Sequence, residues 1–165
     1  MCLVFLGIFI GYSVGAAPII SYHFGAGNTS ELRSLLRKSL IIISLSAVSM
    51  FAASELLARP LTLLFVGRDP TLTAITLRGF LIYSFSFLFA GFAIFSSSFF
   101  TALNNGLISA VISVLRTVVF ETAAVLIFPL LWNVDGIWLS TVGAEAVAAV
   151  VGSVFLICMR RKYHY

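Results

Sequence analysis

Five long apolar runs alternate with short polar or charged stretches along the chain. A helix needs about 20 mostly apolar residues to cross a membrane, and each run reaches that length. The charge-free stretch 79–115 is too long for one crossing, so a turn at Asn104, Asn105 and Gly106 is expected to divide it. The pattern predicts an all-α, polytopic transmembrane helix bundle with spans at about residues 3–24, 39–58, 74–101, 109–132 and 136–158.

The first apolar run carries a stripe of glycines at Gly7, Gly11 and Gly15. Residues four positions apart share one face of a helix. A face of small residues lets a neighbouring backbone approach closely, which is how helices associate in lipid. We therefore expect this face to pack against another helix.

Glycine and proline residues lie at or near the ends of the predicted spans. Pro18 is expected to bend the first helix, which a turn-prone exit at Gly25, Gly27 and Asn28 then closes. A short interfacial helix is expected to follow, before the second span. Pro60 is expected to end that second span, with Glu55 at its exit. Pro129 is expected to kink the fourth span near its end, before a tight turn at 132–136.

Composition places the chain in the membrane. Of its 165 residues, 61% are hydrophobic and 10% are charged, whereas soluble domains carry about 25% charge. So few charges cannot cover a water-facing surface. The chain is therefore predicted to be an integral protein whose surroundings are membrane lipid.

The net charge of +4 is distributed unevenly between the predicted loops. The first loop and the tail carry six basic residues, and the opposite side carries three. These are Arg33, Arg37, Lys38, Arg160, Arg161 and Lys162, against Arg59, Arg68 and Arg78. Basic loops stay in the cytoplasm, so we expect a multi-pass plasma-membrane protein with a cytoplasmic C-terminus. Basic residues that flank apolar runs indicate orientation in a membrane rather than binding to nucleic acid.

Three ionisable residues fall inside the predicted spans: Arg116, Glu121 and Glu145. A rise of about 1.5 Å per residue puts Arg116 about 10 Å deep and Glu121 about 18 Å deep. Glu145 lies about 14 Å from the opposite face by the same measure. Arg116 and Glu121 are five positions apart and point to different sides of their helix, so Arg116 is expected to pair with Glu145.

Charges at membrane depth face a bundle interior or a water-filled cavity. The Arg116–Glu145 pair therefore has two interpretations: an ion pair that holds the bundle together, or a site where Glu145 or Glu121 takes up H⁺, Na⁺ or a cationic substrate. For Glu121, facing a polar cavity without any coupling role is an equal alternative. A stripe of small residues next to Glu145, formed by Ala144, Ala148 and Gly152, is expected to press against another helix.

No nucleophile–base set, metal-ligand spacing or phosphate-binding glycine loop is present in the sequence. We therefore predict neither an enzyme nor a metal or cofactor site.

Three stretches together resemble the MATE family, the multidrug and toxic compound extrusion transporters. They are residues 17–28, residues 103–106 leading to 115–117, and Pro129 followed by 135–138 and 144–145. Their order and spacing extend over nearly the whole chain. The resemblance implies that residues 1–165 form part of a C-terminal lobe and correspond to helices eight to twelve of twelve.

The resemblance also implies cation-coupled antiport, in which H⁺ or Na⁺ enters as organic cations or drugs leave. Because five helices cannot form a two-lobed path, it further implies a missing N-terminal lobe, either in a longer protein or in a partner chain. Two alternatives remain at this stage: a flippase of related fold for lipid-linked oligosaccharides, and a truncated membrane protein that does not transport.

Overall fold

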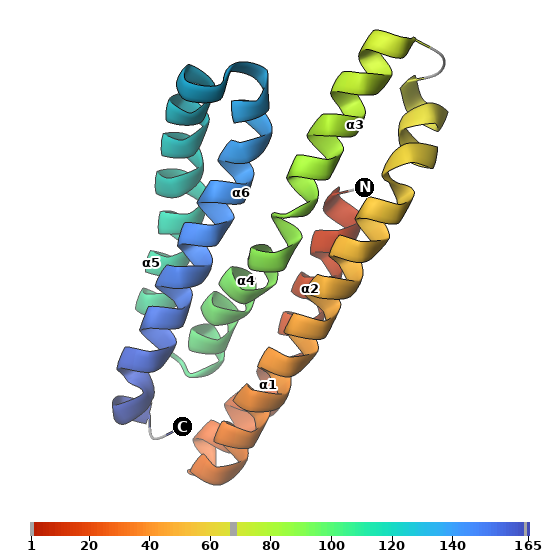
Figure 1. The fold of residues 1–165 in the computed structure, drawn as a ribbon. Coiled ribbons are helices and arrows are strands. Elements are labelled where there is room, and N and C mark those ends of the chain that lie inside the picture. The colour runs from red at the N-terminus through yellow and green to blue at the C-terminus, as the bar shows by residue number, and fades with distance from the viewer. Residues whose placement is uncertain (1, 67–68, 164) are drawn as a thin grey trace.

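The chain forms a bundle of helices (Figure 1). This computed structural model describes residues 2–66, 69–163 and 165, so Arg68, one of the residues counted above, lies outside the described part. The residues that are described contain helices and no strand. The helices are α1 (Cys2–Gly25), α2 (Thr29–Val66), α3 (Pro70–Ser84), α4 (Phe87–Ala102), α5 (Gly106–Val114), the π-helix η1 (Leu115–Phe120) and α6 (Glu121–Tyr163).

These helices make five passes. The stretches 4–25, 29–66 and 106–163 are each long and apolar enough to cross a membrane, and α3 with α4 makes a fourth crossing that is bent by 43°. The third stretch folds back on itself, because Trp132 and Asn133 leave helical geometry inside α6. Figure 1 shows α5 and the last part of α6 running in opposite directions. The prediction of an all-α bundle with five spans is confirmed.

Helix α2 differs from the prediction at both ends. The expected interfacial helix is simply its first turns, and Pro60 lies inside the helix rather than at its end. A proline removes only one backbone hydrogen bond, and the carbonyl that loses its donor belongs to Leu56, a residue that is 79% exposed. The helix therefore continues to Val66, and Glu55 lies within α2 instead of at a membrane exit.

The third predicted span is broken. Helix α3 ends at Ser84 and α4 begins at Phe87. The Phe85 amide donates to the Ile82 carbonyl at 3.3 Å, and the Ser86 amide donates to the Tyr83 carbonyl at 2.9 Å. These hydrogen bonds to the residue three positions earlier give the two backbone amides at the break a partner. Neither amide is therefore left unpaired in apolar surroundings.

Helix α4 is the centre of the bundle, because α1, α2, α5 and α6 all pack against it. The α6 stripe (Ala144, Ala148 and Gly152) is buried and faces α4, as predicted. A Cβ added at Gly152 would lie 2.8 Å from the hydroxyl oxygen of Ser96, so only glycine fits there.

The glycine stripe on α1 does not pack as predicted. A Cβ added at Gly7, Gly11 or Gly15 would meet nothing within 4 Å. Helix α1 packs instead through a neighbouring face, where buried Phe9 lies against Gly91 of α4. The prediction was wrong about contacts inside this chain, because the spacing shows that a face is flat but not what covers it.

The turns follow the predictions more closely. At the exit of α1, Gly27 has a φ of 68°, and the side chain of Asn28 accepts from the Glu31 amide at 3.2 Å to cap α2. Asn104 has a φ of 56°, and Asn105 caps α5 by accepting from the Ile108 amide at 3.2 Å. Both turns are therefore confirmed.

The two other prolines predicted to bend a helix, Pro18 and Pro129, both lie inside a helix, and only Pro129 is close to a break. Helix α1 continues through Pro18 without a break. The fourth span continues through Pro129 and ends three residues later, at Trp132 and Asn133. The tight turn that follows needs Gly136, because a Cβ there would collide with the backbone of Phe128.

Candidate functional site

Arg116 of η1 and Glu145 of α6 form a two-pronged ion pair. Nε of Arg116 donates to Oε2 of Glu145 at 2.9 Å, and Nη2 donates to Oε1 at 2.5 Å. The side chains are 20% and 12% exposed, respectively. Matched geometry of this kind is the strongest form of carboxylate recognition by arginine. The predicted pairing of Arg116 with Glu145 is thus present in the structure.

The π-helix η1 supplies Arg116. The amide of Glu121 donates to the carbonyl of Arg116, five residues earlier. Such wide turns are rare and often lie at functional sites. The extra residue offsets the positions around it from those of a regular α-helix. No feature of the sequence indicated this turn.

Glu121 is not part of the ion pair. Its side chain is exposed at the start of α6, and its carboxylate makes no hydrogen bond or ion pair with any residue that the structure describes. The expectation that Arg116 and Glu121 are poor partners agrees with this placement. A role for Glu121 in an ion or substrate pathway stays a prediction.

A cluster of hydroxyl groups joins α4 to α5 one turn before Arg116. The Ser97 oxygen lies 2.9 Å from that of Ser109 and 2.7 Å from that of Ser113. Thr101 lies 2.6 Å from Ser109. Ser113 is three positions before Arg116. The hydroxyl groups therefore extend a polar path from α4 towards the ion pair.

The same side of α4 lines a hollow against α1 with a volume of about 580 Å³. Ser13, Ser21, Ser97, Ser98 and Thr101 contribute polar groups to its wall, and the remaining lining is mostly apolar. The Ser98 hydroxyl donates to the carbonyl of Ser13 at 3.1 Å. The Ser13 hydroxyl is buried, and no residue in the described part of the chain offers it a hydrogen bond. The sequence showed a run of serines here but not which of them face another helix.

A further carboxylate lies at the bend between α3 and α4. The hydroxyl of Ser84 donates to Oε1 of Glu55 at 2.5 Å. The prediction that Glu55 lies at a membrane exit is wrong, because Pro60 does not end the helix. With α2 continuous, Glu55 lies about three turns before the helix ends.

A second ion pair, Arg78–Asp135, ties α3 to α6 with an N–O distance of 2.5 Å. Its side chains are 70% and 30% exposed. Exposed pairs of this kind contribute little to stability. Within the ranges 2–66 and 69–163, no three His, Cys, Asp or Glu side chains gather in a way that could hold a metal ion.

Comparison with known proteins gives the context for these contacts. The family model described as MatE matches residues 1–123. The chain belongs to the MATE family. MATE proteins are membrane transporters, and the predicted resemblance is therefore confirmed. No curated protein sequence matches the chain.

Solved MATE transporters share the fold. The Vibrio cholerae transporter VcmN in its bent form superposes with a TM-score of 0.87 at 17% identity, over 98% of this chain and 36% of VcmN. A mutant of VcmN gives 0.88 at 17% identity, over 99% of this chain and 38% of that one. An outward-facing multidrug resistance MATE transporter gives 0.86 at 18% identity, over 94% and 35%. This chain thus spans little more than a third of the length of these MATE transporters.

Proposed function

We propose that this chain is the C-terminal-lobe portion of a cation-coupled exporter, in which H⁺ or Na⁺ entry drives organic cations or drugs out of the cell. The single observation that carries the proposal is the Arg116–Glu145 pair, a carboxylate and a guanidinium largely buried between apolar helices. Ionisable residues at membrane depth are costly and mark ion or substrate pathways.

In this proposal Glu145 exchanges partners during transport. A proton or Na⁺ that reaches its carboxylate weakens the two hydrogen bonds from Arg116. This releases η1 from the part of α6 that follows Asn133 and carries Glu145. Hydroxyl groups from Ser97, Ser109 and Ser113 supply oxygen atoms along the approach. Hydroxyl and carboxylate oxygens suit hard cations.

The rest of the transporter is proposed to come from an N-terminal lobe, in a longer protein or a partner chain. Two observations support this. The chain spans 36% of VcmN, and the glycine stripe of α1 is uncovered. The first loop and the tail are proposed to lie in the cytoplasm and the protein in the plasma membrane.

The test is efflux of a fluorescent organic cation from cells that carry Glu145→Gln in the protein as its gene encodes it. Removing one partner of a buried pair leaves the other charge uncompensated. We expect efflux to fall about tenfold or more and its pH dependence to flatten. The matched control is Asp135→Asn, which removes a carboxylate from the exposed pair with Arg78 and should leave efflux within about twofold.

A folding defect is separated from a transport defect by the double variant Arg116→Gln/Glu145→Gln. That variant buries no single charge, so its level in the membrane should recover while efflux stays low. Unchanged efflux and pH dependence in Glu145→Gln would falsify the coupling role and leave the pair as a structural link. Glu121→Gln tests the second carboxylate in the same assay.

A further inference from the structure

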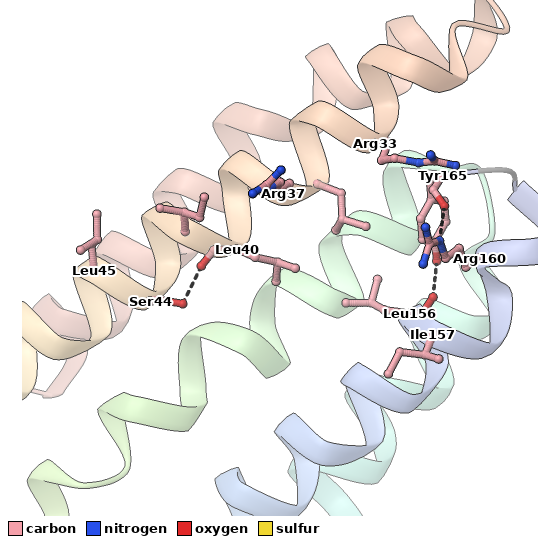
Figure 2. A pocket seen from close by; sticks show the side chains of 11 residues that line it. Arg33, Arg37, Leu40, Ser44, Leu45, Leu156, Ile157, Arg160 and Tyr165 are labelled. Atoms are coloured by element: carbon pink, nitrogen blue, oxygen red, sulfur yellow. Dashed lines mark hydrogen bonds between the residues drawn. The ribbon is translucent and has the colours of Figure 1, made fainter.

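A groove runs between α2 and α6 at the end of the bundle where the first loop and the tail meet (Figure 2). Its volume is about 630 Å³. Arg33, Arg37 and Arg160 surround one end of it, whereas Ile41 and Leu45 lie on the wall further along α2. The groove is thus basic at one end and apolar along its length.

The groove exists because α4 holds its two walls apart. Helices α2 and α6 both pack against α4 but make few or no contacts with each other. Tyr165 forms the floor at the basic end, where it is buried and its ring lies edge-on to Phe99 at 5.1 Å between centroids. Its hydroxyl donates to the Leu156 carbonyl at 3.0 Å. Burial, and secondarily Tyr163, raises the pKa of Tyr165, so this donor stays protonated.

Arg33 and Arg37, at the mouth of the groove, have no carboxylate partner among the residues that the structure describes. Arg33 and Arg37 are exposed and one turn apart on the same face of α2. Neither lies within 4.0 Å of a carboxylate in the part of the chain that the structure describes. Arg160 donates through Nε to the main-chain oxygen of Tyr165 at 3.0 Å, which holds its guanidinium at the groove. Figure 2 shows Arg33 and Arg160 on either side of Tyr165.

The dimensions match one leaflet of a bilayer. Arg33 and Leu45 are twelve positions apart on α2, which corresponds to about 18 Å. Half of a hydrocarbon core is about 15 Å thick. Arg33 therefore lies near the depth of lipid phosphates when Leu45 lies near the middle of the bilayer, and Arg37 lies one turn deeper, about 12 Å from Leu45.

We propose that this groove binds an anionic phospholipid of the cytoplasmic leaflet. Its phosphate lies among Arg33, Arg37 and Arg160, and one acyl chain lies along the wall formed by Ile41 and Leu45. The unpaired charges of Arg33 and Arg37 repel an organic cation, and they favour an anionic headgroup over a zwitterionic one. Basic pockets between membrane helices on the cytoplasmic side hold acidic headgroups in this way. The proposal rests on the cytoplasmic placement of the first loop and the tail proposed above, and not on the transport mechanism.

The test measures the relative association of spin-labelled phosphatidylglycerol and phosphatidylcholine. The whole chain, with any partner that copurifies, is returned to vesicles of these two lipids and studied by electron paramagnetic resonance. We expect a preference for phosphatidylglycerol that Arg33→Gln/Arg37→Gln lowers by up to about thirtyfold, from about 1 kcal/mol for each arginine. The matched control Lys38→Gln/Arg161→Gln removes two charges outside the groove and should keep the preference.

Two further variants separate the contribution of charge from that of the apolar wall to lipid binding. Arg33→Lys/Arg37→Lys keeps the charge and should retain most of the preference, which also shows that replacing these side chains leaves the fold intact. Ile41→Trp fills the acyl wall and should weaken binding without a change in charge. Inorganic phosphate should not displace the labelled lipid. An unchanged preference in Arg33→Gln/Arg37→Gln, an equal loss in the control, or displacement by phosphate would each overturn the proposal.

Discussion

Two helices of the chain carry a small residue at every fourth position. These stripes are Gly7, Gly11 and Gly15 on α1, and Ala144, Ala148 and Gly152 on α6. The α6 stripe is buried against α4, whereas the α1 stripe is open, with nothing within 4 Å of an added Cβ. The same spacing therefore gives one face that packs against a neighbouring helix, on α6, and one face that is exposed, on α1.

The difference lies in the neighbours. Helix α1 uses a second face, which includes Phe9, to reach α4, and the glycines of its stripe are exposed. Small residues lower the steric cost of close approach, but a partner has to be present. The uncovered glycine stripe is the surface that we propose a segment outside this chain to cover, whereas the covered stripe is part of the fold.

The largest expected effect comes from the packed face of α1. Phe9 is 2% exposed and rests on Gly91. Phe9→Ala leaves a cavity and should lower the free energy of unfolding by about 3–5 kcal/mol. Unfolding in mixed detergent, followed by circular dichroism, measures the loss. A loss smaller than that of Gly11→Leu would show that the glycines, and not Phe9, attach α1 to the bundle.

The second prediction concerns the α6 stripe. Gly152→Leu pushes a side chain into Ser96 of α4 and should destabilise the chain by about 1–3 kcal/mol through overpacking. The same unfolding experiment applies. Wild-type stability in this variant would mean that α6 does not lie against α4 as described.

The smallest effect is expected on the open stripe. Gly11→Leu should change the stability of this chain by no more than about 0.5 kcal/mol, since the side chain enters free space. In the assembled transporter the same change should reduce transport, because it would obstruct a segment that covers the stripe. Efflux and unfolding are measured side by side, and a stability loss as large as that of Gly152→Leu would remove the contrast between the stripes.

The sequence was sufficient for the parts of the fold that depend on local chemistry. Helix counts followed from apolar length, and the turns at Gly27 and Asn104 followed from residues that tolerate positive φ. The Arg116–Glu145 pair followed from depth, because two buried charges of opposite sign need each other.

Other features depend on tertiary contacts that apolar patterning does not show. In a membrane protein both buried and lipid-facing positions are apolar, so neither the covering of a stripe nor the π-helix η1 could be deduced. A proline such as Pro60 is typical of a helix end, yet one lost hydrogen bond at an exposed turn is tolerated. The expected helix end also hid Glu55 and its contact with Ser84.

The most direct test of the account is the sidedness of the five crossings. In a background with both cysteines replaced by serine, single cysteines are introduced by Ser30→Cys, Thr71→Cys and Arg161→Cys, and a membrane-impermeant maleimide is applied to intact cells and to everted vesicles. The account predicts that positions 30 and 161 react only in everted vesicles, and position 71 only in intact cells. Reaction of positions 30 and 161 from opposite sides would contradict five crossings.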